Sequence, residues 1–332
     1  MRNGVVACLA FTERGRALAE RIRAALGGEA ACTRDGVGLR EWTAARFPTA
    51  RALVYVGAAG IAVRAVAPHL VSKTGDPAVI CVDEGGRYAI PLASGHLGGA
   101  NALARQIAAA IGAEAVVTTA TDGRGVFAVD EWARTQGLAV VHPERVKAAS
   151  AALLNGETVT LRAAFPIDGE PPEGVILTER DDADVWLDAR PHDALTLVPR
   201  CLTLGVGCRR GTARETLEAR FAALCAAHGV LPEAVCAAAT IDRKRGEAGL
   251  LDFCAAHGWP LLTYTADELA GVAGDFSASA FVRGVTGVDN VCERAAVRAA
   301  RGELLVGKYA GDGVTFALAK RAIRLDWRWR DG

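Results

Sequence analysis

The sequence has no C-x-x-C pair, no apolar run long enough to cross a membrane and no excess of charge of either sign. Its nine cysteines are scattered and odd in number, which excludes a disulfide framework and a zinc knuckle. No apolar run approaches the roughly 20 residues of a membrane helix, and the N-terminus does not show the succession of charged, apolar and small residues that marks a signal peptide. The 38 basic and 38 acidic side chains cancel, so no basic field points to nucleic acid. We therefore expect a cytoplasmic protein that binds neither nucleic acid nor membranes.

What the chain does have is an alternation of strand and helix patterns over 332 residues, enough for two or three compact domains. Such alternation is typical of a mostly parallel sheet with helices on both faces. The pattern weakens between residues 127 and 200 and resumes at 201. We expect an α/β fold in three parts: an N-terminal domain with a mostly parallel sheet, flanking helices and the candidate site (1–126), a small middle domain or linker (127–200), and a C-terminal α/β domain (201–326).

Local signals place several element boundaries. The stretch 83–86 (Asp-Glu-Gly-Gly) predicts a hairpin turn between two strands, and the apolar run 115–119 predicts another strand. Two segments, 212–215 (Thr-Ala-Arg-Glu) and 265–268 (Thr-Ala-Asp-Glu), have the form of a capping box and predict helix starts.

The motif with the most chemical content is 94–101, Ser94-Gly-His96-Leu-Gly98-Gly99-Ala-Asn101. Its glycines allow a ligand to approach backbone N–H groups, and the following helix start favours an anion. An unperturbed histidine pKa of about 6.5 suits His96 for proton transfer. The structural alternative is that Ser94 caps the helix and His96 bonds a neighbouring carbonyl.

A second motif, 118–122 (Thr-Thr119-Ala-Thr121-Asp122), follows a predicted strand, so its hydroxyl groups and carboxylate are expected to face the same crevice as His96. Asp122 would orient the imidazole or act as a base, or else it caps the following turn. Three further candidates belong to an earlier turn between strand and helix, where they suit an acidic ligand or are simply solvated: Gly57, Gly60 and Arg64.

The C-terminal part repeats this theme. The loop 205–211 lies between a strand and a helix but lacks both the G-x-G-x-x-G and the G-x-x-x-x-G-K-[ST] spacing, which argues against a nucleotide-binding enzyme. Arg209, Lys244, Ser277 and Glu293 also sit at predicted turns and helix starts. Each is an ordinary turn residue when taken alone, but together they favour an acidic ligand.

The segments 57–64, 76–78, 83–84, 94–101 and 118–122 resemble the N-terminal domain of cobalt-precorrin-5A hydrolases of anaerobic cobalamin biosynthesis. The segments 205–211, 240–244, 276–282 and 286–293 resemble the C-terminal domain of that family, in the same order. Ser-Gly-His-x-Gly-Gly-Ala-Asn is the most specific element. One departure is Arg294, which follows Glu293 where the family is associated with proline, and the middle segment carries no recognised motif.

The resemblance implies a hydrolase that opens the δ-lactone of cobalt-precorrin-5A and releases acetaldehyde, giving cobalt-precorrin-5B. No cofactor is expected, because the tetrapyrrole substrate carries the cobalt, and no metal site in the protein is expected. His96 would be the general base and Asp122 would orient it. The expected substrate-binding residues are Gly57, Gly60, Arg64, Ser94, Gly98, Gly99, Asn101, Thr119, Thr121, Arg209, Lys244, Ser277 and Glu293.

An alternative from a different class is a non-catalytic protein that binds cobalt-precorrin intermediates and hands them on. Under either hypothesis the expected partners are the tetrapyrrole and neighbouring enzymes of the cobalamin pathway.

Overall fold

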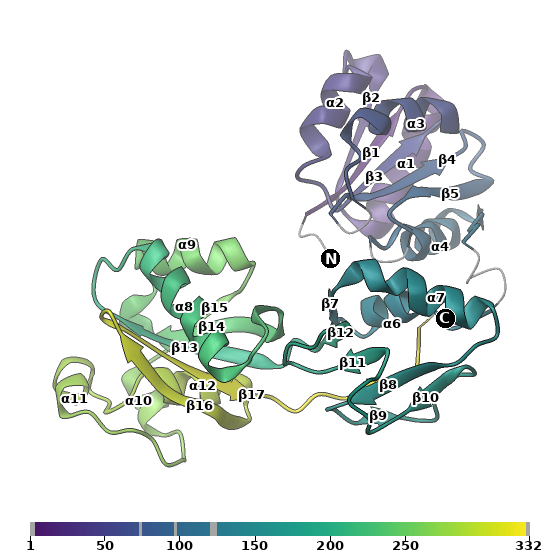
Figure 1. The fold of residues 1–332 in the computed structure, drawn as a ribbon. Coiled ribbons are helices and arrows are strands. Elements are labelled where there is room, and N and C mark those ends of the chain that lie inside the picture. Colours follow the sequence, from purple (N-terminus) through teal and green to yellow (C-terminus); the bar gives the residue numbers. More distant parts are fainter. Residues whose placement is uncertain (1–3, 73–74, 96–97, 120–124, 330–332) are drawn as a thin grey trace.

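The computed structural model describes residues 4–72, 75–95, 98–119 and 125–329, and these form three large sheets in succession along the chain and one two-stranded sheet (Figure 1). Helices and strands alternate in the first and third sheet regions, which confirms the expected α/β class. No described helix is both long and apolar enough to span a bilayer. All nine cysteines are unpaired.

The N-terminal sheet has six strands in the order β2-β1-β3-β4-β5-β6. Its strands are β1 (Val6–Ala10), β2 (Glu29–Cys32), β3 (Ala52–Val56), β4 (Ala78–Val82), β5 (Tyr88–Ala93) and β6 (Glu114–Ala115). The first four are parallel, whereas β5 runs antiparallel to β4 and β6 runs parallel to β5. The sheet is therefore parallel on one side and reversed at the other edge.

Helices cover both faces of this sheet, as the alternation predicted. One core joins alternate strand residues to α1 (Glu13–Leu26) and α4 (Ala100–Ile111). The opposite core joins the other strand residues to α2 (Leu39–Arg46) and α3 (Ala59–Val66). The three central strands β1, β3 and β4 lack charged residues because both of their faces are buried.

The middle sheet has the order β10-β8-β11-β12-β7, with α6 and α7 lying along one side of it (Figure 1). Its elements are α6 (Val129–Thr135), β7 (Ala139–Val141), α7 (Val146–Leu154), β8 (Val159–Ala163), β10 (Val175–Leu177), β11 (Val185–Leu187) and β12 (Leu195–Val198).

The C-terminal sheet has the order β15-β14-β13-β17-β16, with parallel β13, β14 and β15 and antiparallel β16 and β17. Its elements are β13 (Leu202–Cys208), α8 (Arg214–His228), β14 (Val235–Ile241), α9 (Ala248–His257), β15 (Leu261–Tyr264), α10 (Ala266–Ala270), α11 (Ala280–Thr286), α12 (Cys292–Ala300), β16 (Glu303–Gly311) and β17 (Val314–Lys320).

After β17 the chain returns from the C-terminal sheet to the middle one (Figure 1). There, β18 (Leu325–Asp326) pairs in parallel with β9 (Ile167–Asp168). The indole of Trp327 stacks on Trp132 of α6, with ring centroids 5.1 Å apart and an interplanar angle of 17°. The returning tail is thus anchored by aromatic packing as well as by strand pairing.

Four local predictions have clear outcomes. The hairpin at 83–86 is confirmed, and the Asp83 carboxylate accepts the N–H groups of Arg87 and Tyr88 at 2.7 and 2.6 Å. The capping box at Thr265 is confirmed. The box at 212–215 is wrong: α8 starts one residue later, and the Thr212 hydroxyl donates to the Arg209 carbonyl at 2.9 Å. The strand predicted at 115–119 is also shorter than expected, because ladder pairing of β6 ends at Ala115.

Candidate functional site

Strand direction separates the predicted site residues into two groups. Gly57 follows β3 and donates its N–H to the carbonyl of Val82, the last residue of β4. Because β5 is antiparallel to β4, its last residue, Ala93, pairs with Val79 near the start of β4. The 94–101 loop therefore begins near the amino ends of the parallel strands, whereas Gly57 lies at their carboxyl ends.

The loop between β5 and α4 is a tight structure. Ser94 has a left-handed backbone (φ 57°) and is 9% exposed, and its hydroxyl donates to the Asp76 carbonyl at 3.3 Å. A Cβ on Gly98 would collide with the Cβ and carbonyl oxygen of Ser94, so only glycine fits there. Gly99, with φ 80°, caps the start of α4. Gly98 is thus needed for the loop to pack on itself, and Gly99 for its left-handed backbone.

Asn101 links the two N-terminal motifs. Its side chain is buried, with 2% of the residue exposed, and Nδ2 donates to Oγ1 of Thr119 at 3.1 Å. The loop folds around this amide, since a Cβ on Gly95 would lie 3.0 Å from Asn101 Oδ1. The structure thereby brings the 94–101 loop together with the chain that leaves β6.

Two amides at the start of α4 are already used by the loop. The N–H of Ala100 donates to the Ser94 carbonyl at 3.0 Å, and the N–H of Asn101 donates to the Gly95 carbonyl at 2.9 Å. These groups do not face a ligand as donors. Any role of this helix start in holding an anion would have to use other amides.

The middle region supplies a neighbour that the sequence did not indicate. Arg134 of α6 lies against the start of α4, where a Cβ on Gly99 would be 3.7 Å from Arg134 Cδ. Arg134 Nη2 is 2.8 Å from Glu131 Oε1, and the side chains are 9% and 4% exposed. Arg134 and Glu131 are three positions apart on α6 and belong to no sequence motif. Only the contact in the folded structure shows that they lie beside the 94–101 loop.

Three of the predicted residues, His96, Thr121 and Asp122, lie outside the described residues. In the sequence, His96 adjoins Gly95, and Asp122 follows Thr119 by three positions. The described parts of both motifs flank them. Gly60 and Arg64 lie exposed on α3, which follows Gly57 at the carboxyl ends of the parallel strands, and so lie apart from the 94–101 loop and Thr119.

In the C-terminal sheet region, Ser277 and Glu293 are brought together and bond each other. The Ser277 N–H donates to Glu293 Oε2 at 2.8 Å, and its hydroxyl donates to Oε1 at 3.1 Å. Asn290 Nδ2 and the Lys308 N–H also donate to this carboxylate, each at 2.6 Å. Because Glu293 is 1% exposed and accepts four hydrogen bonds, it ties three chain segments together.

Lys244 is also occupied by a protein group. Its Nζ is 3.0 Å from Glu247 Oε1, while Glu247 Oε2 accepts the Gly211 N–H at 2.9 Å. The Gly211 N–H and the Lys244 ammonium lower the pKa of Glu247. Arg209 is exposed, and its N–H donates to the Gly313 carbonyl at 3.0 Å. Of these two cations, Arg209 is the better placed to meet an anionic ligand.

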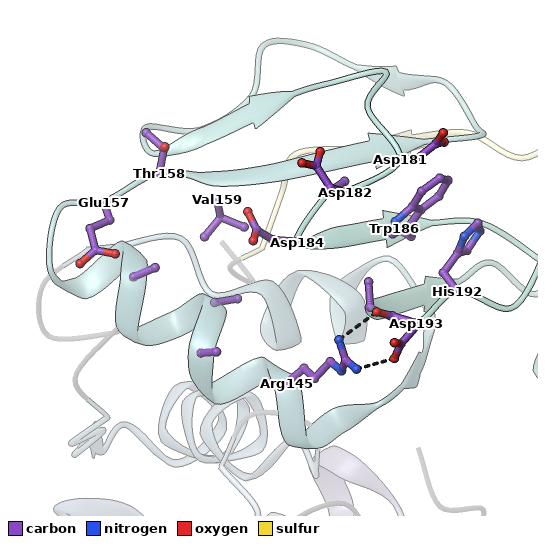
Figure 2. Close-up of a pocket in the computed structure, with 15 residues that line it drawn as sticks. Arg145, Glu157, Thr158, Val159, Asp181, Asp182, Asp184, Trp186, His192 and Asp193 are labelled. Carbon is purple, nitrogen blue, oxygen red and sulfur yellow. Dashed lines mark hydrogen bonds and ion pairs between the residues drawn. The ribbon is translucent and has the colours of Figure 1, made fainter.

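A cavity of about 750 Å³ lies in the middle region, beside α7 and the loops that flank β11 (Figure 2). Its walls are rich in aspartate, but these carboxylates already have partners within the protein. Arg145 pairs with Asp193, as Figure 2 shows, and the Thr160 hydroxyl and N–H bind Asp184. None of the predicted site residues that the structure describes lines this cavity. Its chemistry does not match an acidic ligand.

No group of three His, Cys, Asp or Glu side chains placed to hold a metal occurs in the described parts of the chain. Burial raises the pKa of the Cys81 and Cys201 thiols to about 11, and that of Cys225 to about 12. These cysteines are neutral packing residues at ordinary pH.

Comparisons with known proteins cover nearly the whole chain. Three family models match in order: Cobalamin synthesis G N-terminal (41–122), Cobalamin biosynthesis central region (127–198) and Cobalamin synthesis G C-terminus (202–319). Cobalt-precorrin-5A hydrolase of Salmonella typhimurium is 33% identical, over 94% of this chain and 97% of the relative. That of Priestia megaterium is 31% identical, over 68% and 67%. A solved cobalamin biosynthesis protein G homolog from Sulfolobus solfataricus has 19% identity, with a TM-score of 0.42 over 95% of this chain and 97% of that one.

Proposed function

The chain belongs to the cobalt-precorrin-5A hydrolase family, and from this membership we propose that it opens the δ-lactone of cobalt-precorrin-5A in anaerobic cobalamin biosynthesis. The observation that carries the proposal is the 33% identity to the Salmonella typhimurium enzyme over nearly the full length of both chains. All three family regions are present in the family's order.

The proposed reaction consumes one water. Water adds to the lactone carbonyl and the ring C–O bond breaks, leaving a carboxylate and an alcohol. Loss of the alcohol proton then breaks the adjacent C–C bond in the retro-aldol sense. The two-carbon fragment leaves as acetaldehyde, while the macrocycle keeps the electron pair of the C–C bond and takes up a proton to give cobalt-precorrin-5B. The conjugated ring of the substrate, with its own cobalt, is the electron sink, so no resident cofactor is required.

We assign this chemistry to the 94–101 loop and the 118–122 segment. His96 would be the general base, either on the attacking water or on the liberated hydroxyl, and Asp122 would orient it. The hydrogen bond between Asn101 and Thr119 supports this assignment, because it joins the two segments that carry these residues. Ser94, Gly98 and Gly99 would shape the loop rather than contact the substrate through side chains.

We further propose a cytoplasmic location. Nine cysteines without a disulfide are the state expected in a reducing compartment. Neighbouring enzymes of the same pathway are the proposed partners, because the substrate has to be received from one enzyme and the product passed to another.

Anaerobic incubation of the purified protein with the lactone-bearing cobalt-precorrin tests the function. Acetaldehyde is measured by a coupled reductase, and the mass of the product is recorded. One acetaldehyde per opened lactone is the expected result. Tight binding without acetaldehyde would contradict the hydrolase and favour a protein that holds and hands on the intermediate.

The His96→Asn variant tests the assignment of the base. Loss of a general base lowers turnover by about 10² to 10⁴-fold. His142, which lies 3.3 Å from Glu144 in the middle region, provides the matched control, and His142→Asn is expected to keep wild-type turnover. Full turnover by folded His96→Asn would remove His96 from the mechanism.

A further inference from the structure

A basic pocket lies where the chain passes between the middle and C-terminal sheets. It encloses about 520 Å³, within the range of small-molecule sites. One wall is Phe165, from the segment after β8, and the others come from the turn between α12 and β16 and from the end of β17 with the residues that follow it. Among the residues that the structure describes, none from the 94–119 region lines it.

Three cations line this pocket against one carboxylate: Arg301, Lys320 and Arg321 against Glu303. Within the described chain, none of the three cations forms an ion pair, whereas Arg298 on the same α12 helix pairs with Glu268 at 3.8 Å. Arg321 Nη2 donates to the Arg200 carbonyl at 2.8 Å, which orients the guanidinium without neutralising it.

The position of Arg301 is a second, independent observation. It caps the end of α12 in the left-handed conformation, with φ 50°. Among the described α-helices, four others end in a left-handed residue, and in each the residue is glycine: Gly112, Gly229, Gly258 and Gly287. Glycine adopts this conformation without the steric cost that arginine incurs. An arginine at a strained position next to a cavity indicates a use for its side chain.

The pocket also has an apolar, aromatic side. Lys320 Nζ lies 4.5 Å from the centre of the Phe165 ring, which holds the ammonium at the wall. Pro166 and Ile323 complete that side. A ligand with carboxylate arms on a hydrocarbon ring matches both parts of the pocket.

We propose that this pocket binds the carboxylate arms of an acidic tetrapyrrole, at a site separate from the 94–101 loop. The identity of the ligand rests on the proposed function, and the pocket chemistry rests on Arg301, Lys320 and Arg321. Such a site would hold the macrocycle at the junction through which the chain passes twice, so binding there would restrain the two sheets relative to each other.

The test uses uroporphyrin, a free-base porphyrin with eight carboxylates, as the probe. Arg301→Gly removes a cation and relieves the backbone strain, so the affinity for uroporphyrin should fall while the melting temperature does not. We expect a melting temperature equal to or above that of wild type and a Kd raised roughly fivefold. Asp312→Gly is the matched control, because Asp312 is also left-handed (φ 51°) but lies in the β16–β17 hairpin. It should leave the Kd unchanged.

Protection from acetylation locates the bound probe. Uroporphyrin should slow acetylation of Lys320 while leaving the exposed Lys147 unaffected. An unchanged Kd in Arg301→Gly, an equal loss in Asp312→Gly or absent protection of Lys320 would each overturn the proposal. Acetaldehyde release by the same wild-type protein separates the two proposals: turnover with unprotected Lys320 overturns only this one, whereas protected Lys320 without turnover overturns only the hydrolase.

Discussion

Asn101 Nδ2 donates a hydrogen bond to Thr119 Oγ1 across 3.1 Å, and this bond joins the loop after β5 to the chain that leaves β6. The two residues are 18 positions apart, and one belongs to each of the two motifs assigned to the chemistry. The geometry of the candidate site therefore depends on a buried amide.

Removing this bond should reduce both stability and turnover. We expect Asn101→Ala to lower the free energy of unfolding by about 1 to 3 kcal/mol, since a buried polar partner is lost, and to slow acetaldehyde release. Thr119→Val removes the same bond from the other side. A double-mutant cycle, measured by urea unfolding and by turnover, should give a coupling of about 1 kcal/mol. Additive effects would show that the two motifs are not linked through this bond.

Two glycine substitutions should act in opposite directions. Gly98→Ala places a methyl group against Ser94 and should destabilise the protein by about 1 to 3 kcal/mol and lower turnover. Gly60 lies exposed on α3, where an added Cβ meets only Arg64 Nη1, at 4.0 Å. Gly60→Ala should stabilise the protein by about 0.5 to 1 kcal/mol through helix propensity. Thermal unfolding and acetaldehyde release check both variants, and a loss of turnover in Gly60→Ala would place the α3 face in contact with substrate.

Periodicity was sufficient to predict the α/β class and the helices on both faces, because apolar spacing directly reports burial. It did not report strand direction. The reversal of β5 depends on the short turn at Asp83. As a consequence, Gly57 and Ser94 lie at opposite ends of the strands. Gly57, Gly60 and Arg64 were expected to bind the same ligand as the 94–101 loop, but strand direction separates them from it, whereas Thr119 does lie beside Asn101.

Contacts between regions were also invisible in the sequence. The contact of Arg134 with Gly99 joins residues from two regions and has no local pattern. The two capping boxes make the same point on a smaller scale, since Thr265 caps its helix but Thr212 bonds Arg209 instead. Local side-chain options compete, and tertiary context decides between them.

The division at 126 and 200 remains a prediction. If the three regions fold separately, limited proteolysis should cut first between them, within about five residues of these positions. Mass spectrometry of the fragments gives the cut sites. Early cuts inside β3 or β13 would contradict the division.

Glu293 should behave as a structural residue. Its two oxygens accept four hydrogen bonds, so Glu293→Gln points an amide N–H₂ at two donors in either orientation. We expect a loss of about 2 to 3 kcal/mol in the free energy of unfolding. Glu215→Gln, on the exposed start of α8, is the control and should stay within about 0.5 kcal/mol of wild type. If Glu293→Gln unfolds like wild type but binds substrate weakly, the carboxylate contacts substrate after all.

Acid should weaken the anchoring of the returning tail. The Arg328 side chain, the Arg328 N–H and Gln136 hold the pKa of Asp326 at about 2, below the ordinary 3.8. Since the folded pKa is the lower one, the contribution of ionised Asp326 to stability is present above about pH 4 and is lost as the pH falls towards 2. Asp326→Asn should therefore be less stable than wild type at pH 6, and the difference should shrink at pH 3. Urea unfolding followed by tryptophan fluorescence reports this directly, because Trp327 stacks on Trp132. A difference that stays constant from pH 6 to pH 3 would show that the Asp326 charge does not hold the tail.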